Sequence, residues 1–589
     1  MTARATSLLV FVLGVTLIVA ACSSAEAPEV AELPEATAPA EATAEPTLLP
    51  TGTPVVIEVA SPEERDRIAA AVELSDELSI VPSRLSAATT AIEIRDTPID
   101  GAARIVLGRW AAITDQRRDV FELTRDDVAA ALRGEIANWS ELGGSSLPLT
   151  LVLPSSQAAA IANALGVATA DFDATVVPDE DIVDLVESEP GTLAIVEPEA
   201  LRLGVLALVV DGHDPYRDPA ADSPLRDARW IAAPAGQASR IAELAGFEAA
   251  PTFDPAGMLA TGELIPARCT YEALVAVGGM DAMFDATGDA IAAADITVSP
   301  LEVSLTDLSV PTPCISTFTL QGPAEAAEAM ARAGIDVAIT AGNHAMDCWE
   351  GCSPAAALLD TISNLENAGL VTAGAGADLD AARRPATFTV ETQNGPVSFA
   401  FIAYDSIAAA FYAAGPDSPG TAPLETAFLR EDVEVALSLA DHVIVGAGWG
   451  VEYTSDPIAF QRENAGAAID LGATVVLGNH PHWVQAVEHF PGDRFPQTPD
   501  ARPDDALVAY SFGNFVFDQD WSVETTQGMA MDLGFTADRL IGYRIRPVII
   551  RGLPELTRGL YRPEFVDPAG EGRVILDRIW DAQDRLPER

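Results

Sequence analysis

Apolar runs alternate with amphipathic stretches along most of the chain. In the first half, β-branched runs at 55–59, 149–153, 192–196 and 205–210 alternate with helical patterns at 63–74 and 125–132. From residue 258, short apolar runs end in clusters of Gly, Asn and His, and amphipathic stretches separate them. This alternation predicts α/β structure in both halves. In the second half we expect the chemistry to lie on loops at strand ends.

The N-terminus has the pattern of an export signal. Arg4 precedes an apolar run at 7–19, and the residues Val-Ala-Ala-Cys at 19–22 resemble a lipobox. We expect residues 1–21 to be a lipoprotein signal peptide, after which lipidated Cys22 anchors the chain outside the cytoplasmic membrane. The alternative is an ordinary signal peptide that happens to contain a cysteine.

The remaining chain is too long for one ordinary hydrophobic core, so we expect two large domains. Residues 22–54 are rich in Ala, Glu, Pro and Thr and are typical of a flexible tether. The predicted boundaries that follow are 55–235 for the first domain, 236–257 for a linker and 258–589 for the second domain.

The charge balance is strongly acidic. The chain has 88 Asp and Glu residues against 34 basic residues, all of them Arg, and a net charge of −54. Nucleic acid is therefore excluded as an expected partner, because phosphate neutralisation needs a basic surface. Charge-driven binding to an anionic membrane is disfavoured for the same reason. The simplest interpretation of the acidity itself is solubility.

Four cysteines lie beyond Cys22, at Cys269, Cys314, Cys348 and Cys352. An even number in an exported chain favours disulfides, and all three pairings are possible. A zinc site made of the four thiolates is the alternative, although the spacing lacks paired C-x-x-C elements. A disulfide at Cys348 or Cys352 would either fix the nearby His344 loop or simply stabilise it.

Two histidine motifs follow apolar runs. Asn343-His344 comes after 337–339, and Gly-Asn-His480-Pro-His482 comes after 474–477. Asn can give a carbonyl oxygen to a metal, and a neighbouring His can donate a proton. Two histidines around a proline can serve one or two metal ions. An isolated His is more often structural, but two such motifs at strand ends favour a site.

The first domain resembles the PstS-like periplasmic solute-binding family. The resemblance is carried by the segment 121–144, with its Gly-Glu-Ile-Ala-Asn-Trp turn, and by the segments 189–195 and 210–215. It implies a periplasmic-binding-protein-like α/β domain. Where that family has a Ser-Gly-Thr anion loop, this chain has Pro-Ser155-Ser156-Gln. Anion binding and capping of the next helix are the alternatives for these serines.

The second domain resembles the CapA family, over about 258–530. Asn343-His344 with Asp347 resembles its N-N-H-x-x-D element, and His480-Pro-His482 resembles H-P-H. Further matching segments are Gly262-Glu263 with Arg268, 301–302, 359–376, 449–453 and 510–519. The resemblance implies a calcineurin-like metallophosphatase fold, a four-layer α/β sandwich. It also implies one or two divalent metals (Mn, Zn or Fe), hydrolysis of phosphoester-like bonds, and a part in capsule or poly-γ-glutamate synthesis or export.

Carried over residue by residue, the resemblance gives each motif a role. Glu263 and His482 would hold one metal, and Asn343 and His480 the other. His344 would be the catalytic proton donor. The remaining pocket positions are Arg268, Glu302, Asp347, Glu452 and Asn514. Three of these, Glu302, Asp347 and Glu452, are candidates to replace lost ligands.

Three positions depart from the family pattern. Glu263 stands where the family has Asp, Pro300 where it has Asn, and Gly448 where it has His. Pro300 and Gly448 offer no ligand atom. The leading hypothesis is a lipid-anchored metallohydrolase that acts on a cell-envelope polymer or phosphoester. The alternatives are a non-catalytic polymer- or anion-binding protein and, on the first domain alone, a solute receptor. The sequence predicts no oligomeric state.

Overall fold

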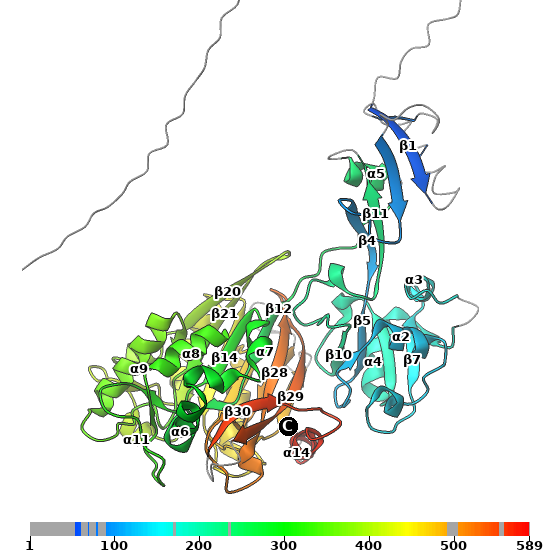
Figure 1. Ribbon diagram of the computed structural model, residues 1–589. Helices are drawn as coiled ribbons and strands as arrows, with labels where there is room; N and C mark the ends of the chain where they lie inside the picture. The colour runs from blue at the N-terminus through cyan, green and yellow to red at the C-terminus, as the bar shows by residue number, and fades with distance from the viewer. Residues whose placement is uncertain are drawn as a thin grey trace, which may run out of the picture. The chain divides into compact units, whose positions relative to one another are not determined.

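The computed structural model describes residues 53–59, 69, 78–80, 90–168, 172–233, 237–244, 246–491, 505–552 and 559–587 (Figure 1). The chain divides into two units after Thr51. The predicted signal peptide, Cys22 and nearly all of the predicted tether lie outside the described residues. Among the helices that are described, none has the length and apolar character needed to cross a bilayer.

Two sheets form the part of the chain before residue 250. A five-stranded sheet has the order β2 (Leu78–Ile80), β1 (Thr53–Val59), β3 (Thr90–Arg95), β11 (Arg226–Ala232), β4 (Ala103–Arg109). A six-stranded sheet has the order β6 (Glu122–Leu123), β10 (Val205–Val210), β5 (Ala111–Asp115), β9 (Thr192–Val196), β7 (Thr150–Pro154), β8 (Thr175–Val177).

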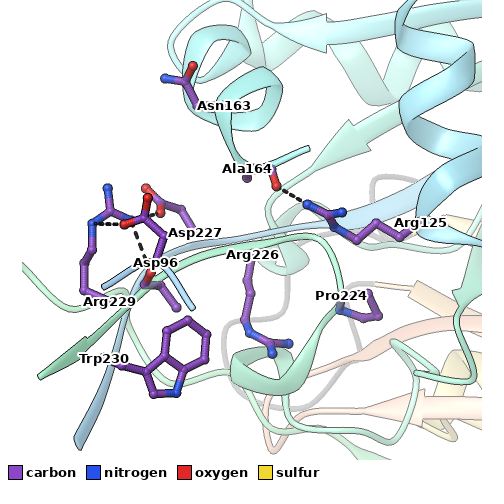
Figure 2. A pocket seen from close by; sticks show the side chains of 10 residues that line it. Asp96, Arg125, Asn163, Ala164, Pro224, Arg226, Asp227, Arg229 and Trp230 are labelled. Carbon is purple, nitrogen blue, oxygen red and sulfur yellow. Dashed lines mark hydrogen bonds and ion pairs between the residues drawn. The ribbon is translucent and has the colours of Figure 1, made fainter. Parts of the chain in front are cut away.

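Helices cover both faces of the six-stranded sheet. On one face, Val128 of α2 (Arg125–Leu132) and Ile161 of α3 (Ala158–Ala164) join the core, and on the other Val186 of α4 (Ile182–Ser188) does so. A fourth helix, α5 (Ala238–Leu244), follows β11. A cavity lined by residues of α2, α3 and β11 lies in this part of the chain (Figure 2).

Two larger sheets form the C-terminal part. The first has the order β18 (Val371–Ala373), β17 (Val337–Ile339), β14 (Ile296–Pro300), β12 (Ala256–Ala260), β28 (Gln527–Phe535), β29 (Leu540–Gly552), β30 (Leu560–Phe565). The second has the order β20 (Ala386–Thr392), β21 (Gly395–Asp405), β23 (His442–Gly448), β24 (Val475–Asn479), β26 (Asp505–Ala509), β25 (Val487–Pro491).

Short strand pairs and further helices complete this part. The pairs are β13 (Glu263–Leu264) with β27 (Asn514–Val516), β15 (Ser304–Leu305) with β16 (Gln321–Gly322), and β19 (Ala375–Gly376) with β22 (Gly420–Thr421). The helices are α6 (Arg268–Val277), α7 (Gly288–Ala292), α8 (Glu325–Ala333), α9 (Pro354–Ala368), α10 (Leu379–Ala382), α11 (Ala409–Tyr412), α12 (Thr426–Leu437), α13 (Ala459–Leu471) and α14 (Arg573–Asp584).

The two C-terminal sheets pack face to face between helices. One buried cluster joins Val298 of the first sheet to Phe399 of the second. A second cluster holds Met330 of α8 against the outer face of the first sheet, and a third holds Leu429 of α12 against the outer face of the second. The layers are therefore helix, sheet, sheet, helix, which confirms the predicted α/β class and the expected four-layer sandwich.

Parallel pairing places several strand ends at one edge of each sheet. Strands β12, β14 and β17 are mutually parallel neighbours, and so are β21, β23 and β24. Because parallel strands end at the same edge, the loops that follow them meet there. The Asn-His and His-Pro-His motifs lie on two of these loops, one from each sheet.

Candidate metal centre

The first predicted ligand pair is brought together. The Nδ1 atom of His482 lies 2.8 Å from Oε2 of Glu263 and 2.9 Å from Oδ1 of Asn514. Strands β13 and β27 pair in parallel, with Glu263 opposite Asn514, which fixes both residues beneath the loop of His482. Burial disfavours the charged forms, but attraction between the two side chains prevails. It lowers the pKa of Glu263 and raises the pKa of His482.

The second predicted pair is also found. Nδ1 of His480 lies 3.0 Å from Oδ1 of Asn343, and the backbone N–H of His480 donates to Oε1 of Glu263 at 2.5 Å. Burial and the neighbouring positive charge of His482 lower the pKa of His480 to about 4. His480 is therefore a neutral imidazole at physiological pH, the form that binds metal ions.

Backbone strain is concentrated at these loops. Among the described residues, five that are not glycine have positive φ, and four of them lie here: Arg268 (52°), Tyr453 (61°), His480 (94°) and His482 (59°). Such conformations cost energy and persist where the surroundings enforce them, commonly at functional sites. The N–H of Tyr453 donates to the carbonyl of Pro481 at 2.9 Å, and its ring stacks on that of His482.

A buried carboxyl group lies beside the two pairs. Nδ2 of Asn479 donates to Oε1 of Glu302 at 2.5 Å. Within the described residues, neither Oε2 of Glu302 nor Oδ1 of Asn479 accepts a hydrogen bond, although both atoms are buried. Burial, Glu263 and Asp405 together raise the pKa of Glu302 well above its ordinary value. Acceptor oxygens left without a donor in a protein interior are costly, and a cation would relieve that cost.

Two members of this cluster were missed from the sequence. Asn479 belongs to the Gly-Asn-His-Pro-His motif, so its place in that motif was an available signal. Asp405, at the end of β21, had no sequence signal beyond ending an apolar run. Its carboxylate is fully buried and accepts the N–H groups of Ile407 at 2.7 Å and Ala408 at 3.2 Å.

His344 is oriented by Asp347. Its Nδ1 lies 2.7 Å from Oδ2 of Asp347, which also accepts the N–H of Leu320 at 2.6 Å. This contact leaves Nε2 of His344 as the ring nitrogen available to a substrate. Asp347 was a candidate replacement ligand, and the structure directs it to His344 instead.

Two other predicted pocket residues have different surroundings. The guanidinium of Arg268 is tied to Asp518 and donates to the carbonyl of Thr317 at 2.6 Å, and it lies over the ring of Phe517. It is therefore held by the protein at the edge of the cluster. Glu452 is exposed and forms no hydrogen bond or ion pair with either histidine in the described residues, although its charge helps to raise the pKa of His482.

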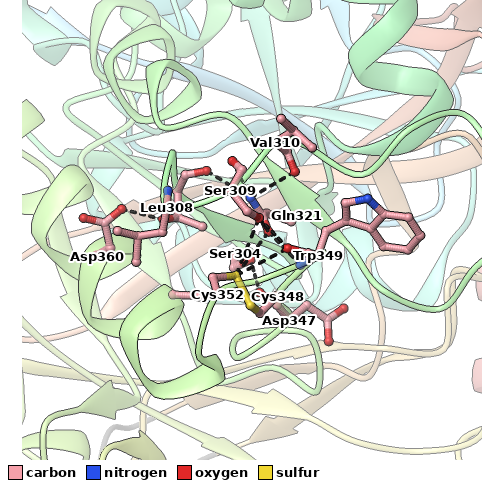
Figure 3. The surroundings of a disulfide bond; sticks show 12 residues. Ser304, Leu308, Ser309, Val310, Gln321, Asp347, Cys348, Trp349, Cys352 and Asp360 are labelled. Carbon is pink, nitrogen blue, oxygen red and sulfur yellow. Dashed lines mark hydrogen bonds between the residues drawn. A yellow bond between two sulfur atoms is a disulfide. The ribbon is translucent and has the colours of Figure 1, made fainter.

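Both disulfides lie near the centre. Cys269 pairs with Cys314, and Cys348 pairs with Cys352, so no thiolate is left for the alternative zinc site. Figure 3 shows Gln321 between two loops, where its Oε1 accepts the N–H of Trp349 at 2.8 Å. The Cys348–Cys352 bridge thus closes the loop that directly follows Asp347.

The donor atoms suit a divalent ion in chemistry and in pairwise spacing. Cis ligands about 2.1 Å from one ion lie about 3 Å from each other, close to the Glu263–His482 and Asn343–His480 distances. Within the described residues no three His, Cys, Asp or Glu side chains converge on one point. Each centre would therefore rest on one His, a carboxylate or amide oxygen, and water.

Pro300 and Gly448 leave two ligand positions of the family pattern without a donor atom. Pro300 ends β14 without a donor atom, and Gly448 ends β23 opposite Asp405 on β21. A Cβ atom at position 448 would lie 3.0 Å from the carbonyl oxygen of Ala341. The space at this position is therefore tight, and Asp405 is the nearest carboxylate on the neighbouring strand.

In the N-terminal part, the Ser155-Ser156 loop is already filled by a carboxylate. Asp179 accepts the N–H of Ser156 at 3.1 Å and its hydroxyl, and the hydroxyl of Ser155 at 3.3 Å. These hydrogen bonds, that of the Ser156 hydroxyl first, lower the pKa of Asp179. Neither serine caps α3. Helix capping by these serines is therefore wrong, both serines hydrogen-bond to Asp179, and anion binding at this loop stays a prediction.

The C-terminal part is similar to known sequences. Residues 257–519 match the family model of the bacterial capsule synthesis protein PGA_cap. The PGA biosynthesis protein CapA of Bacillus subtilis (strain 168) is 30% identical over 203 residues, which are 34% of this chain and 48% of that protein. The predicted recognition of a CapA-like region is confirmed for these residues. The chain spans only about half of that relative's length.

Solved structures give weaker likenesses. The calcineurin-like phosphoesterase YfkN of Bacillus subtilis is 13% identical, with a TM-score of 0.30 over 56% of this chain and 97% of that one. A putative phosphate ABC transporter substrate-binding protein of Clostridium perfringens, solved with bound phosphate, is 16% identical, with a TM-score of 0.20 over 33% and 92%. These scores support no conclusion about activity or ligand.

Proposed function

We propose that the CapA-like region is a metal-dependent hydrolase that acts on a phosphoester or related bond in the synthesis or export of a capsule or poly-γ-glutamate type polymer. The observation that carries the proposal is the buried cluster of Glu263, Glu302 and Asp405. All three carboxyl groups are at most 1% exposed, and in the described part of the chain only Glu263 forms an ion pair, with His482. A divalent cation would compensate this buried charge.

The protein's own groups would then divide the work. Glu263 with His482, and Asn343 with His480, would hold the metal, with Glu302 beside them. A bound divalent ion supplies a water of lowered pKa and polarises the oxygens of the scissile group. His344, with Nδ1 fixed by Asp347, would give a proton from Nε2 to the leaving group. Arg268 stays bound to Asp518 and shapes the rim.

The test is metal content together with hydrolysis. The full-length chain, purified in detergent and loaded with Mn²⁺ or Zn²⁺, is compared with His480→Ala and Asn343→Ala on a generic phosphodiester. We expect metal binding and hydrolysis that both substitutions reduce at least tenfold. Glu434→Gln, at an exposed position of α12 outside this cluster, is the control and should change neither. Activity that survives in both variants would show that the cluster is not the catalytic centre.

Pro300 and Gly448 favour a second candidate, a non-catalytic protein of the cell envelope that binds polymer through the same fold. It predicts no metal above background, no turnover, and equal behaviour of the wild type and both variants. The same experiment therefore separates the two candidates.

We also propose that the chain works outside the cytoplasmic membrane, anchored through Cys22. The support is the lipobox-like sequence at 19–22. Cys22→Ala should move the protein from the membrane fraction to the soluble fraction of its host. Unchanged membrane association would contradict lipid anchoring at this residue.

A further inference from the structure

An arginine-lined cavity of about 300 Å³ lies in the N-terminal part, away from the metal cluster. Figure 2 shows Arg125 from the start of α2, Arg226 and Arg229 from β11, and Trp230 on its wall. Asn163 and Ala164 line it from the C-terminal end of α3. The serine loop filled by Asp179 lies before the other end of that helix, so the two places are distinct.

Only one of the three arginines is neutralised. Arg229 pairs with Asp227 and lies 3.3 Å from Asp96, and both carboxylates also line the cavity. Arg125 and Arg226 form no ion pair with any carboxylate in the described part of the chain. The lining holds three arginines against two aspartates, so it keeps a net positive charge in a chain of net charge −54. Two partly buried arginines without an ion-pair partner point to an anionic ligand.

Backbone carbonyls hold these two guanidinium groups in place. Arg125 donates through Nη2 to the carbonyl of Ala164, and Arg226 donates through Nη1 to the carbonyls of Asp222 at 2.7 Å and Ser223 at 2.5 Å. Carbonyl groups orient the side chains without cancelling their charge. Burial, then Arg104 and Arg125, lower the pKa of Arg226, and the charge of Asp222 opposes them only in part.

We propose that this cavity binds a dicarboxylate, or two carboxylates of an acidic polymer. Two uncompensated guanidinium groups match two carboxylates, and each planar fork can bind one of them in bidentate fashion. The ring of Trp230 offers an apolar wall for the methylene groups between the acids. Phosphate fits less well, because the lining contains no Ser, Thr or Gly to donate further hydrogen bonds. Asp96 and Asp227 repel both ligands, but a dicarboxylate can place its two charges apart, one on each unpaired arginine.

The inference rests on this cavity alone and stands or falls independently of the metal centre. Calorimetry on the full-length protein at low salt would compare glutarate, an oligomer of six γ-linked glutamates, and inorganic phosphate. We expect glutarate or the oligomer to bind, and the double variant Arg125→Gln/Arg226→Gln to weaken that binding at least tenfold. Arg133→Gln, the same change at the far end of α2 and outside the cavity, should alter it less than twofold.

A second variant protects the test against misfolding. Asn163→Asp adds a carboxylate to the cavity without touching the hydrogen bonds of either arginine, and it should also weaken binding tenfold or more. Tighter binding of the oligomer than of glutarate would assign the site to a polymer, and equal binding would assign it to a free acid. Binding of neither at millimolar concentration, binding unchanged in the variants, or tighter binding of phosphate would overturn the proposal.

Discussion

The Nδ1 atom of His482 faces two oxygen atoms, Oε2 of Glu263 and Oδ1 of Asn514. Despite its burial, these contacts raise the pKa of His482 above its ordinary value. A metal ion at this pair must displace a proton from Nδ1, because the ring nitrogen cannot bind both. The metal-free protein therefore favours a proton where the proposed metal would bind.

This predicts a pH-dependent metal affinity. Between pH 6 and pH 8, Mn²⁺ should bind more tightly as the pH rises, because the proton that Glu263 and Asn514 favour on His482 is then lost more easily. Calorimetry in buffers of different ionisation enthalpy should detect release of about one proton. In His482→Gln the release should disappear. Binding without proton release, or affinity independent of pH in this range, would contradict the assignment of His482 as a ligand.

Glu302 gives a second prediction at the same scale. Its pKa is raised in the folded protein, so folding takes up a proton, and its contribution to stability is lost as the pH rises through the folded pKa. At pH 8 without metal, Glu302→Gln should therefore raise the free energy of unfolding by about 1–3 kcal/mol.

The same substitution should weaken Mn²⁺ binding, because an amide is a poorer ligand than a carboxylate. Urea unfolding at pH 5 and pH 8 measures the stability, with Glu434→Gln at an exposed position of α12 as the control. A variant that is less stable at pH 8, or one with unchanged metal affinity, would show that Glu302 has only a packing role.

For single residues, the sequence predicted the members of the two histidine motifs but not the buried carboxyl groups that surround them. The pairs Glu263–His482 and Asn343–His480 came from motif resemblance, and the structure places each pair in contact. Asp405 could not be found in this way. Its importance depends on burial beside other carboxylates, and burial of charge is a property of the folded chain.

Among the elements, the loop after β17 depends on a glycine. A Cβ atom at Gly342 would lie about 2.5 Å from Cδ and Oε1 of Glu302, well inside van der Waals contact. The position therefore needs the absence of a side chain so that the carboxyl group can pack against the loop. This packing brings the strand end of β14 next to the Asn-His motif.

Gly342→Ala should consequently weaken metal binding and any hydrolysis at least tenfold, and should lower stability by about 1–3 kcal/mol, as overpacking does. Gly288→Ala is a suitable control, because a Cβ there approaches only Phe284, at 3.9 Å, and alanine favours the helix. Thermal unfolding and metal titration of both variants provide the measurement. If Gly342→Ala bound metal as tightly as the wild type, the loop would be shown to accommodate the added methyl group without displacing Glu302.

Local periodicity located many elements well. The predicted helix at 125–132 is α2, and the apolar runs at 205–210 and 337–339 are β10 and β17. Pairing could not be predicted, because it joins segments far apart in sequence. Strand β11, for example, lies in the sheet between β3 and β4, and both of these strands precede it in the sequence by more than a hundred residues. The predicted helix at 63–74 lies almost wholly outside the described residues, and the predicted domain boundaries stay predictions.

For the molecule as a whole, one buried arginine links the N-terminal and C-terminal parts. Arg544 of β29 donates to both carboxylate oxygens of Asp214, at 2.7 and 3.0 Å, and through Nη2 to the carbonyl of Ala207 at 2.9 Å. Arg544 and Asp214 are 3% and 4% exposed. Burial alone would raise the pKa of Asp214, but Arg544 outweighs it and lowers the pKa to about 2.

Breaking this pair should destabilise the whole described assembly. Asp214→Asn removes one of the two carboxylates that face the buried guanidinium of Arg544 and leaves only Asp532, whose Oδ2 lies 3.0 Å from Nη1. The expected cost is about 3 kcal/mol, the lower end for breaking a buried ion pair. Asp584→Asn is the matched control, since Asp584 pairs with Arg117 across the same two parts but in solvent, where such a pair contributes less than about 1 kcal/mol. Urea unfolding at pH 7 measures both changes.

Acid should remove the same contribution. A carboxyl group whose folded pKa is lowered stabilises the protein above its ordinary pKa of about 3.9, and this stabilisation is lost as the pH falls through about 2. Between pH 4 and pH 2, the difference in the free energy of unfolding between wild type and Asp214→Asn should therefore shrink. The corresponding difference between wild type and Asp584→Asn should change little. A constant difference between wild type and Asp214→Asn across this range would mean that packing around Arg544, and not its charge, joins the two parts.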